Sequence, residues 1–199
     1  MPRKIFTDPS FLFLLVANFY CLYYYENNKA DFATVIWIFW LQSVTIGFFT
    51  FLELLTLKNY DAANFTMNDQ PITAKNKGCA ARFFLLHYGM FHFVYVIFLL
   101  VKHTDGLVHQ TVLLIGFAGF LIEGIIGFRQ RKQIEASVKV SIATIFFLPY
   151  VRIVPMHLMI LGPAILGWQP GTMFLVLKIM ADITSYILYR SIYNKSSNL

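Results

Sequence analysis

Four ionisable side chains lie within two apolar stretches in the last third of the chain. Arg152 and His157 belong to RIVPMHLMILGP, and Lys178 and Asp182 belong to LVLKIMADITSY. Lys178 and Asp182 are four residues apart, which places both on one face of a helix. If the two stretches are antiparallel neighbours, Arg152 and Asp182 lie at similar depth and can pair, with Lys178 and His157 in the next layer. The surplus positive charge predicts an anionic or carboxylated ligand.

The same four residues also have a purely structural interpretation. Arg152 can be the counter-ion of a buried carboxylate, and a pair with Asp182 can fix the register of two helices. That interpretation leaves Lys178 and His157 without a role. The sequence leaves both interpretations open.

Two histidines and two glutamates form a second set of candidates. His87 and His92 lie five residues apart in FFLLHYGMFHFVYVIFLL, about 140° around a helix. They therefore do not form the i, i+4 chelate of a zinc helix. A divalent metal such as zinc could still bind His92 with His157, or His87 with Glu53 or Glu123. The alternative for each histidine is a neutral side chain hydrogen-bonded to a carbonyl group.

Glu53, Glu123 and His87 are expected at similar depth, near the ends of their helices. Two carboxylates and an imidazole in one place would suit a proton path or a divalent-metal site. The alternative for either glutamate alone is a side chain that extends to the membrane interface.

The composition places these residues in a membrane protein. Hydrophobic residues make up 58% of the 199-residue chain and charged residues only 13%, whereas a soluble domain is about one-quarter charged. Because each crossing needs about 20 apolar residues, the chain has room for about six helices and no separate soluble domain. The two cysteines, Cys21 and Cys79, show no metal-binding spacing and are expected to be free thiols.

We therefore expect an all-α fold, a single transmembrane domain over residues 1–199 that forms a six-helix bundle. Asp8 and Pro9 are typical of a helix N-cap and first turn. Prolines in the fifth segment, at positions 149, 155 and 163, predict that this helix is broken or kinked. The expected helices cover residues 9–25, 32–57, 80–102, 107–128, 139–167 and 170–193.

Basic residues predict the orientation of this bundle, because cytoplasmic segments retain positive charge. Lys29 and Lys102 alone fall on one side, and Arg152 and Lys178 fall within helices. We therefore expect six crossings of the inner (cytoplasmic) membrane with both termini cytoplasmic, and a charge of +6 that faces anionic lipid and not nucleic acid. The cytoplasmic side would carry Arg3, Lys4, Lys58, Lys75, Lys77, Arg82, Arg129, Arg131, Lys132, Lys139, Arg190 and Lys195.

The fourth expected helix carries small residues along one face. Gly116, Gly119, Glu123 and Gly127 follow one another at spacings of three, four and four residues. Such a stripe predicts close packing against a neighbouring helix.

Three short segments carry a resemblance to a known family. FFLLHYG, RIVPMH and LKIMAD together resemble a family of uncharacterised bacterial polytopic integral membrane proteins, catalogued as a domain of unknown function, over the third to sixth helices. The resemblance implies no activity. It adds weight to five residues, His87, Arg152, His157, Lys178 and Asp182. His92 is outside the resembling motif, so a joint His87/His92 metal site gains no support from it.

These features favour a transporter or channel-like protein that holds an ion or small polar ligand among the third, fifth and sixth helices, since charged residues beside broken helices are typical of transporter sites. Six helices would need to form a homo-oligomer to complete a pathway. A second hypothesis is a membrane-embedded hydrolase, with a metal held by His87, His157 and Asp182 or the glutamates. A third is a structural or assembly protein with buried ion pairs only. The sequence does not decide whether the protein is an enzyme.

Overall fold

The computed structural model describes residues 5–62, 65–67, 70–102, 108–167 and 171–195. Nearly all of them are helical. The helices are α1 (Pro9–Asn27), α2 (Phe32–Thr56), α3 (Lys77–Lys102), α4 (Gln110–Glu135), α5 (Ile142–Leu166) and α6 (Thr172–Lys195), preceded by a 3₁₀ turn at Ile5–Thr7. Four two-residue strands, β1 (Tyr60–Asp61), β2 (Thr66–Met67), β3 (Gln70–Pro71) and β4 (Val140–Ser141), complete the described elements.

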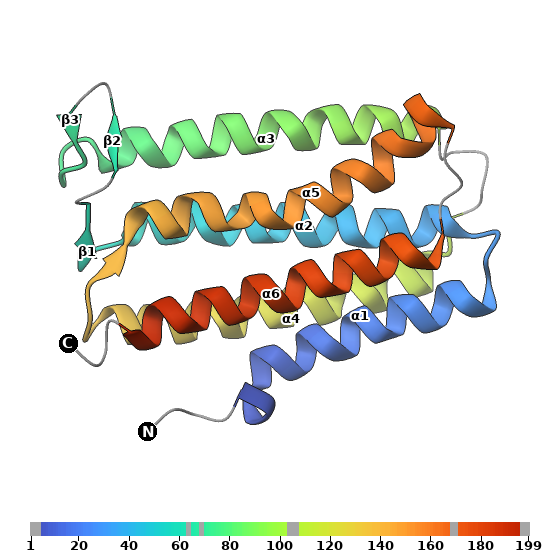
Figure 1. Ribbon diagram of the computed structural model, residues 1–199, viewed down its shortest axis with the longest axis horizontal. Coiled ribbons are helices and arrows are strands. Elements are labelled where there is room, and N and C mark those ends of the chain that lie inside the picture. Colours follow the sequence, from blue (N-terminus) through green and yellow to red (C-terminus); the bar gives the residue numbers. More distant parts are fainter. Residues whose placement is uncertain (1–4, 63–64, 68–69, 103–107, 168–170, 196–199) are drawn as a thin grey trace.

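The helices lie side by side and run in alternating directions (Figure 1). All four strands lie at one end of the bundle with the start of α1 and the end of α6, and we call this the strand end. There β1 pairs in parallel with β4, and β2 pairs antiparallel with β3. Helix α2 contacts α3, α4 and α5, while α1 packs on α4 and α6, and α5 packs on α6. Every described helix therefore shares the interior with at least two others.

Local capping explains where several of these helices begin. Asp8 accepts a hydrogen bond from the Ser10 backbone N–H at 3.0 Å, and Pro9 follows it at the first position of α1, as expected. Asp31 caps α2 in the same way through the Thr34 N–H at 3.0 Å. Each cap supplies an acceptor for a backbone donor that the helix itself leaves unpaired.

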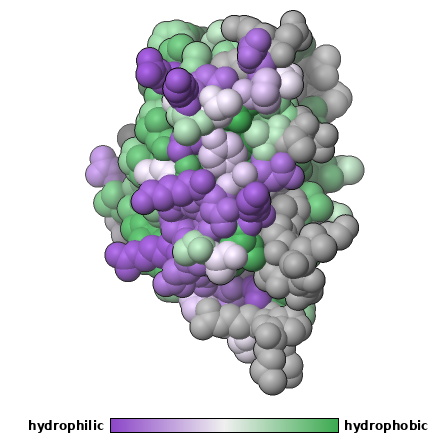
Figure 2. Space-filling view, turned by 90° about the vertical axis from the view of Figure 1, so that its left-hand side faces the viewer, coloured by the Kyte–Doolittle hydropathy of each residue, from purple (hydrophilic) through white to green (hydrophobic). Residues whose placement is uncertain are grey.

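Apolar side chains cover the outside of the bundle. Five of the described helices, α2 to α6, are long and apolar enough to cross a membrane, and α1 is not in this set. Leu86, Phe93 and Val101 on α3 are each at least 66% exposed, which would be costly in water. Figure 2 looks onto the strand end, where hydrophilic side chains gather in the middle of the face and hydrophobic ones lie around them. This distribution supports a membrane protein.

The fifth helix agrees with only part of the expectation. The prolines predict a break or a kink, and α5 is continuous from Ile142 to Leu166, through positions 149, 155 and 163, so the described helix has no break. Packing against α2, α3 and α6 keeps the segment helical. The axis of α5 turns toward α3 in its second half (Figure 1), so the effect of the prolines is a bend. The expected starts of the fourth and sixth helices, at residues 107 and 170, lie outside the described residues.

The glycine stripe on α4 is a close-packing surface, as the spacing predicts. A Cβ atom added to Gly116 would come within 2.8 Å of the Ile38 side chain, and one added to Gly119 would come within 3.1 Å of Ala17. Gly124, which is not part of the expected stripe, is even closer to its neighbour: an added Cβ would lie 2.7 Å from the Phe49 ring. Helices α1 and α2 approach α4 at these positions because no side chain intervenes.

We expect Gly124→Ala to lower the free energy of unfolding by about 1–3 kcal/mol, because the added methyl group overlaps the Phe49 ring. Gly89→Ala on α3 is the matched control, since an added Cβ there meets nothing within 4 Å. Thermal unfolding of both variants in detergent measures the difference. Equal stability of the two variants would contradict close packing of α2 on α4.

The start of α1 is joined to α4 and α6 by polar contacts. Arg190 on α6 donates to Asp8 at 2.6 Å, and Gln130 on α4 donates to the same carboxylate at 2.9 Å. Burial by itself would raise the pKa of Asp8, but hydrogen bonds from Gln130, Tyr186 and the Ser10 backbone and the charge of Arg190 hold that pKa below its ordinary value.

A carboxylate with a lowered pKa stabilises the fold above its ordinary pKa, and this contribution is lost as the pH falls through the lowered value. We therefore expect Asp8→Asn to reduce the free energy of unfolding by about 1–3 kcal/mol at neutral pH. The difference from wild type should shrink below about pH 4. Unfolding in detergent across this pH range tests the idea, and a difference that does not change with pH would refute it.

Candidate functional site

A buried polar cluster lies where α1, α2, α5 and α6 meet. Asp182 on α6 is fully buried, and its Oδ2 atom accepts from Lys178 Nζ at 2.6 Å. The same oxygen accepts from the amides of Gln42 at 2.9 Å and Asn18 at 3.1 Å. Lys178 also donates to Gln42 Oε1 at 2.6 Å, and its ammonium lies 4.8 Å from the centre of the Phe39 ring. Lys178 and Asp182 are thus held by hydrogen bonds from two further helices.

Arg152 approaches this cluster from α5 but is held loosely. Its Nε atom lies 3.7 Å from Asp182 Oδ1, which confirms the expected pairing of these two residues. The Arg152 guanidinium makes no hydrogen bond to any residue that the structure describes, although the residue is only 8% exposed. Asp182 Oδ1 also has no hydrogen-bond partner within the described part of the chain. A buried cation and a carboxylate oxygen are therefore both available to a ligand.

A cavity leads to Arg152 from the strand end. Its volume is about 280 Å³, and it lies among α1, α2, α4, α5 and α6. Asp8, Gln130 and Arg190 line it near the strand end, and Glu123 and Arg152 line it deeper in the bundle. Arg152 lies ten residues after the start of α5, which corresponds to about 15 Å of helix. A small polar molecule that enters at the strand end would meet this guanidinium.

Glu123 contributes a second ionisable group to the cavity. It is 6% exposed, and its Oε1 accepts from the Ser10 hydroxyl at 3.3 Å. Among the described residues, no cation lies within ion-pair distance of Glu123, although Arg152 and Arg131 are near enough to act on it electrostatically. Glu123 thus shares a cavity with Arg152 without being paired to it.

The expected meeting of Glu53, Glu123 and His87 does not occur. Glu53 forms an ion pair with Arg131 at 2.8 Å, whereas His87 Nδ1 is bonded to the Tyr150 hydroxyl at 2.8 Å. His87 lies apart from the two glutamates, because α3 lies on the side of α2 away from α4 (Figure 1). Similar depth in the membrane was therefore not enough to bring them together.

His157 is not in the cluster with Lys178, which corrects a second expectation. It lies on an exposed part of α5, and its Nδ1 is bonded to the Tyr95 hydroxyl of α3 at 2.8 Å. The physical reason is helical geometry: five residues separate His157 from Arg152, about 140° around the helix, so the two side chains leave α5 in different directions. Gln42 occupies the place beside Lys178 that His157 was expected to fill.

Both ring nitrogens of His92 are engaged in hydrogen bonds. Its Nε2 is bonded to the Ser43 hydroxyl at 2.8 Å and its Nδ1 to the Tyr88 carbonyl at 2.9 Å. His87, His92 and His157 thus each belong to a separate contact. Within the described ranges, no three His, Cys, Asp or Glu side chains lie close enough together to hold a metal ion.

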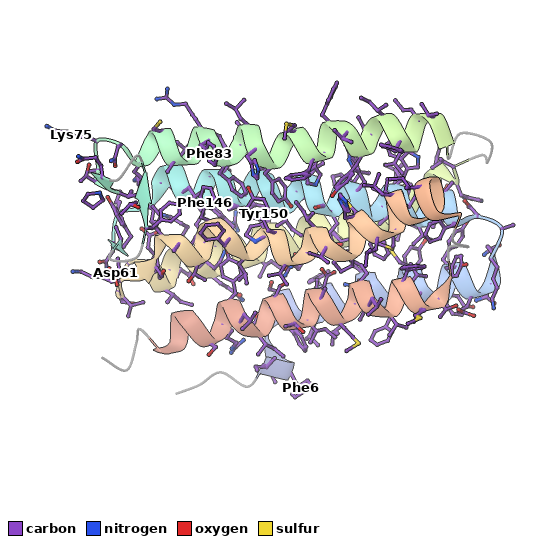
Figure 3. The ribbon with its side chains drawn as sticks, turned by 45° about the horizontal axis from the view of Figure 1, so that its top comes forward. Phe6, Asp61, Lys75, Phe83, Phe146 and Tyr150 are labelled. Carbon is purple, nitrogen blue, oxygen red and sulfur yellow. The ribbon has the colours of Figure 1, made fainter. Side chains whose placement is uncertain are left out.

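A second cavity, of about 460 Å³, lies between α3 and α5 near the strand end. Figure 3 shows Phe83 on α3 facing Phe146 and Tyr150 on α5 in this region. The His87 ring stacks on Phe83 with an angle of 8° between the ring planes. The walls of this second cavity are mainly aromatic, so it lacks the charged groups that line the first cavity.

Two residues of the cluster, Asn18 and Gln42, were missed by the sequence analysis. Each is an amide within an otherwise apolar helical segment, and that position was the available signal. Ser10, the partner of Glu123, was not predicted either, because a serine directly after the α1 cap is typical of the first turn of a helix.

The chain has no significant match among curated proteins or among solved structures. A family model described as a family of unknown function (DUF6498) matches residues 1–193. This match covers nearly the whole chain and is consistent with the resemblance found in the third, fifth and sixth helices. The protein therefore belongs to this family of unknown function, DUF6498.

Proposed function

We propose that the protein is a multi-pass membrane transporter or channel-like protein that holds an ion or small polar ligand at Arg152, beside Asp182 and Lys178. One observation carries this proposal. The Arg152 guanidinium lies at the inner end of a cavity, is almost completely buried, and makes no hydrogen bond within the described part of the chain.

A purely structural role for Arg152 fits this geometry poorly. A charged side chain inside a bilayer costs at least about 2.5–3.5 kcal/mol on insertion scales, so a structural one is expected to be fully paired. Lys178 meets that expectation through Asp182 and Gln42, and Asp182 Oδ2 meets it through Lys178, Gln42 and Asn18. Arg152 has only the 3.7 Å contact with Asp182 and no hydrogen bond among the described residues, which supports a ligand as its further partner.

Because the cavity is open on one side of Arg152 only, it supports a transporter with alternating access and not an open pore. The cavity extends from the strand end to Arg152. The next residues toward the far end are closely packed, because the side chains of Lys178, Cys21 and Phe39 are each at most 1% exposed. A ligand at Arg152 could leave toward the far end of the bundle only after the helices rearrange. Such closure on one side of a central site is how transporters alternate access.

Flux through proteoliposomes tests the proposal. We expect Arg152→Gln to slow the uptake of the transported ion at least about tenfold, the effect of losing about 1.4 kcal/mol of binding. Arg152→Lys keeps the charge and serves as a second variant if the first does not fold. Arg129→Gln is the matched control, because Arg129 is exposed on α4.

The assay should compare formate, chloride and potassium in parallel. Equal rates for wild type, Arg152→Gln and Arg129→Gln with every ion would overturn the proposal. Such a result would favour a structural role for the buried charges.

The proposed topology has six crossings, including α1, with the strand end in the cytoplasm. Helix α1 has 19 residues, about 28 Å at about 1.5 Å per residue, close to the roughly 30 Å of a hydrocarbon core. It lies along α4 and α6 for its length (Figure 1). The basic residues at the strand end, such as Lys75, Lys77 and Arg82, support the cytoplasmic assignment.

The native cysteines allow a direct test of this orientation. Cys79 is exposed near the strand end, and Cys21 is buried. We expect a membrane-impermeant maleimide to label Cys79 in inverted vesicles and not in right-side-out vesicles. Asn28→Cys in a Cys79→Ser background, at the far end of the bundle, should show the opposite pattern. The same labelling pattern for both positions would contradict an odd number of crossings between them.

A further inference from the structure

Most of the described charged side chains around the first cavity and the cluster form close ion pairs, and two do not. Each pair is joined by a charge-assisted contact of 2.8 Å or less. The pairs are Arg131 with Glu53, Arg190 with Asp8, and Lys178 with Asp182. Arg152, whose contact with Asp182 is 3.7 Å long, and Glu123 are the charged side chains that these pairs leave over.

The remaining cation is suited to one class of ligand. A guanidinium is a planar fork of N–H donors that matches a carboxylate or similar oxyanion with two parallel hydrogen bonds. The Arg152 fork faces a cavity of about 280 Å³, which has room for a small molecule. Because Arg152 is a single cation, the matching charge is that of a monovalent anion.

The remaining carboxylate sets a condition on that ligand. An ionised Glu123 in the same cavity would repel an anion at Arg152, whereas a protonated Glu123 would not and could donate a hydrogen bond. Binding of an anion and binding of a proton to Glu123 therefore favour each other, and this coupling is reciprocal. The pair brings no net charge into the bundle.

Other ionisable groups near Glu123 are already engaged. On α1, Asp8 is bound to Arg190, and on α2, Glu53 is bound to Arg131. The groups that face Glu123 from the surrounding helices are Ser10 and Asp8 on α1, Glu53 on α2, Arg131 on α4, Arg152 on α5, and Asp182, Tyr186, Tyr189 and Arg190 on α6.

We propose that the ligand of this cavity is a small monovalent carboxylate, or another planar monovalent oxyanion, bound by the Arg152 guanidinium together with one proton on Glu123. This inference deepens the proposed function and rests on it. The step is a binding equilibrium: the anion forms hydrogen bonds with Arg152, and the Glu123 carboxylate takes one proton from water.

Calorimetric binding of sodium formate to the full-length protein in detergent tests this inference. Titrations at about pH 5.5 and 7.5, each in two buffers of different ionisation enthalpy, count the protons taken up. Wild type should take up one proton per formate at the higher pH, and its affinity should fall by up to about tenfold per pH unit there.

The variants separate the two residues. Glu123→Gln should bind formate with no proton uptake and with an affinity independent of pH. Arg152→Gln should weaken formate binding at least about tenfold, and Arg152→Lys should reduce the preference for formate over chloride because the planar fork is lost. Glu26→Gln is the matched control and should retain the proton uptake of wild type, since Glu26 is partly exposed, pairs with Lys29 and does not line the cavity.

Each part of the inference can fail separately. Unchanged proton uptake in Glu123→Gln, or none in wild type, would overturn the role of Glu123. Formate binding that does not depend on Arg152 would overturn the anion site. If formate does not bind but the flux of potassium depends on Arg152, the ligand class is wrong while the proposed function stands.

Discussion

The rest of the structure depends on one constraint: charged groups inside an apolar bundle must be paired or hydrogen-bonded, because hydrocarbon offers no alternative partner. The constraint is met on one of the two carboxylate oxygens of Asp182. That oxygen accepts from Lys178, Gln42 and Asn18, so three donors from three helices are fixed around a single atom. This contact sets the relative depth of α1, α2 and α6, and α5 then brings Arg152 to the remaining oxygen.

The packing of α4 determines the space that this network leaves. Small residues at Gly116, Gly119 and Gly124 allow α1 and α2 to approach α4 closely. Nearer the strand end, polar contacts join α4 and α6 to the start of α1, with Gln130 and Arg190 both bound to Asp8. The cavity lies among these contacts, and its lining includes Gly124 and Gly127 as well as Asp8, Gln130 and Arg190.

Parts of this arrangement follow from the sequence, and other parts require the three-dimensional structure. The i, i+4 spacing of Lys178 and Asp182 on α6, and the few residues that separate α5 from α6 in sequence, were enough to predict the pairing of Asp182 with Arg152. Apolar runs gave the number of helices, and basic residues marked the strand end. The direction in which a side chain leaves its helix was harder to predict. His157 lies at the expected depth, but it faces α3 and not the cluster. Partners such as Arg131 for Glu53 come from a different helix, and no local pattern predicts them. The continuity of α5 depends on packing that outweighs the local effect of its prolines.

The loose contact between Arg152 and Asp182 has a consequence for how the site can be filled and emptied. If Arg152 were the main partner of Asp182, a ligand that drew it away would leave a buried carboxylate unpaired, at a cost of several kcal/mol. Asp182 instead retains Lys178 and two amides when Arg152 moves. In the proposed site, Arg152 would therefore exchange its 3.7 Å contact with Asp182 for a bound anion without disturbing the contacts that hold α1, α2 and α6. A site built in this way would separate the residues that keep the fold together from the residue that binds the proposed ligand.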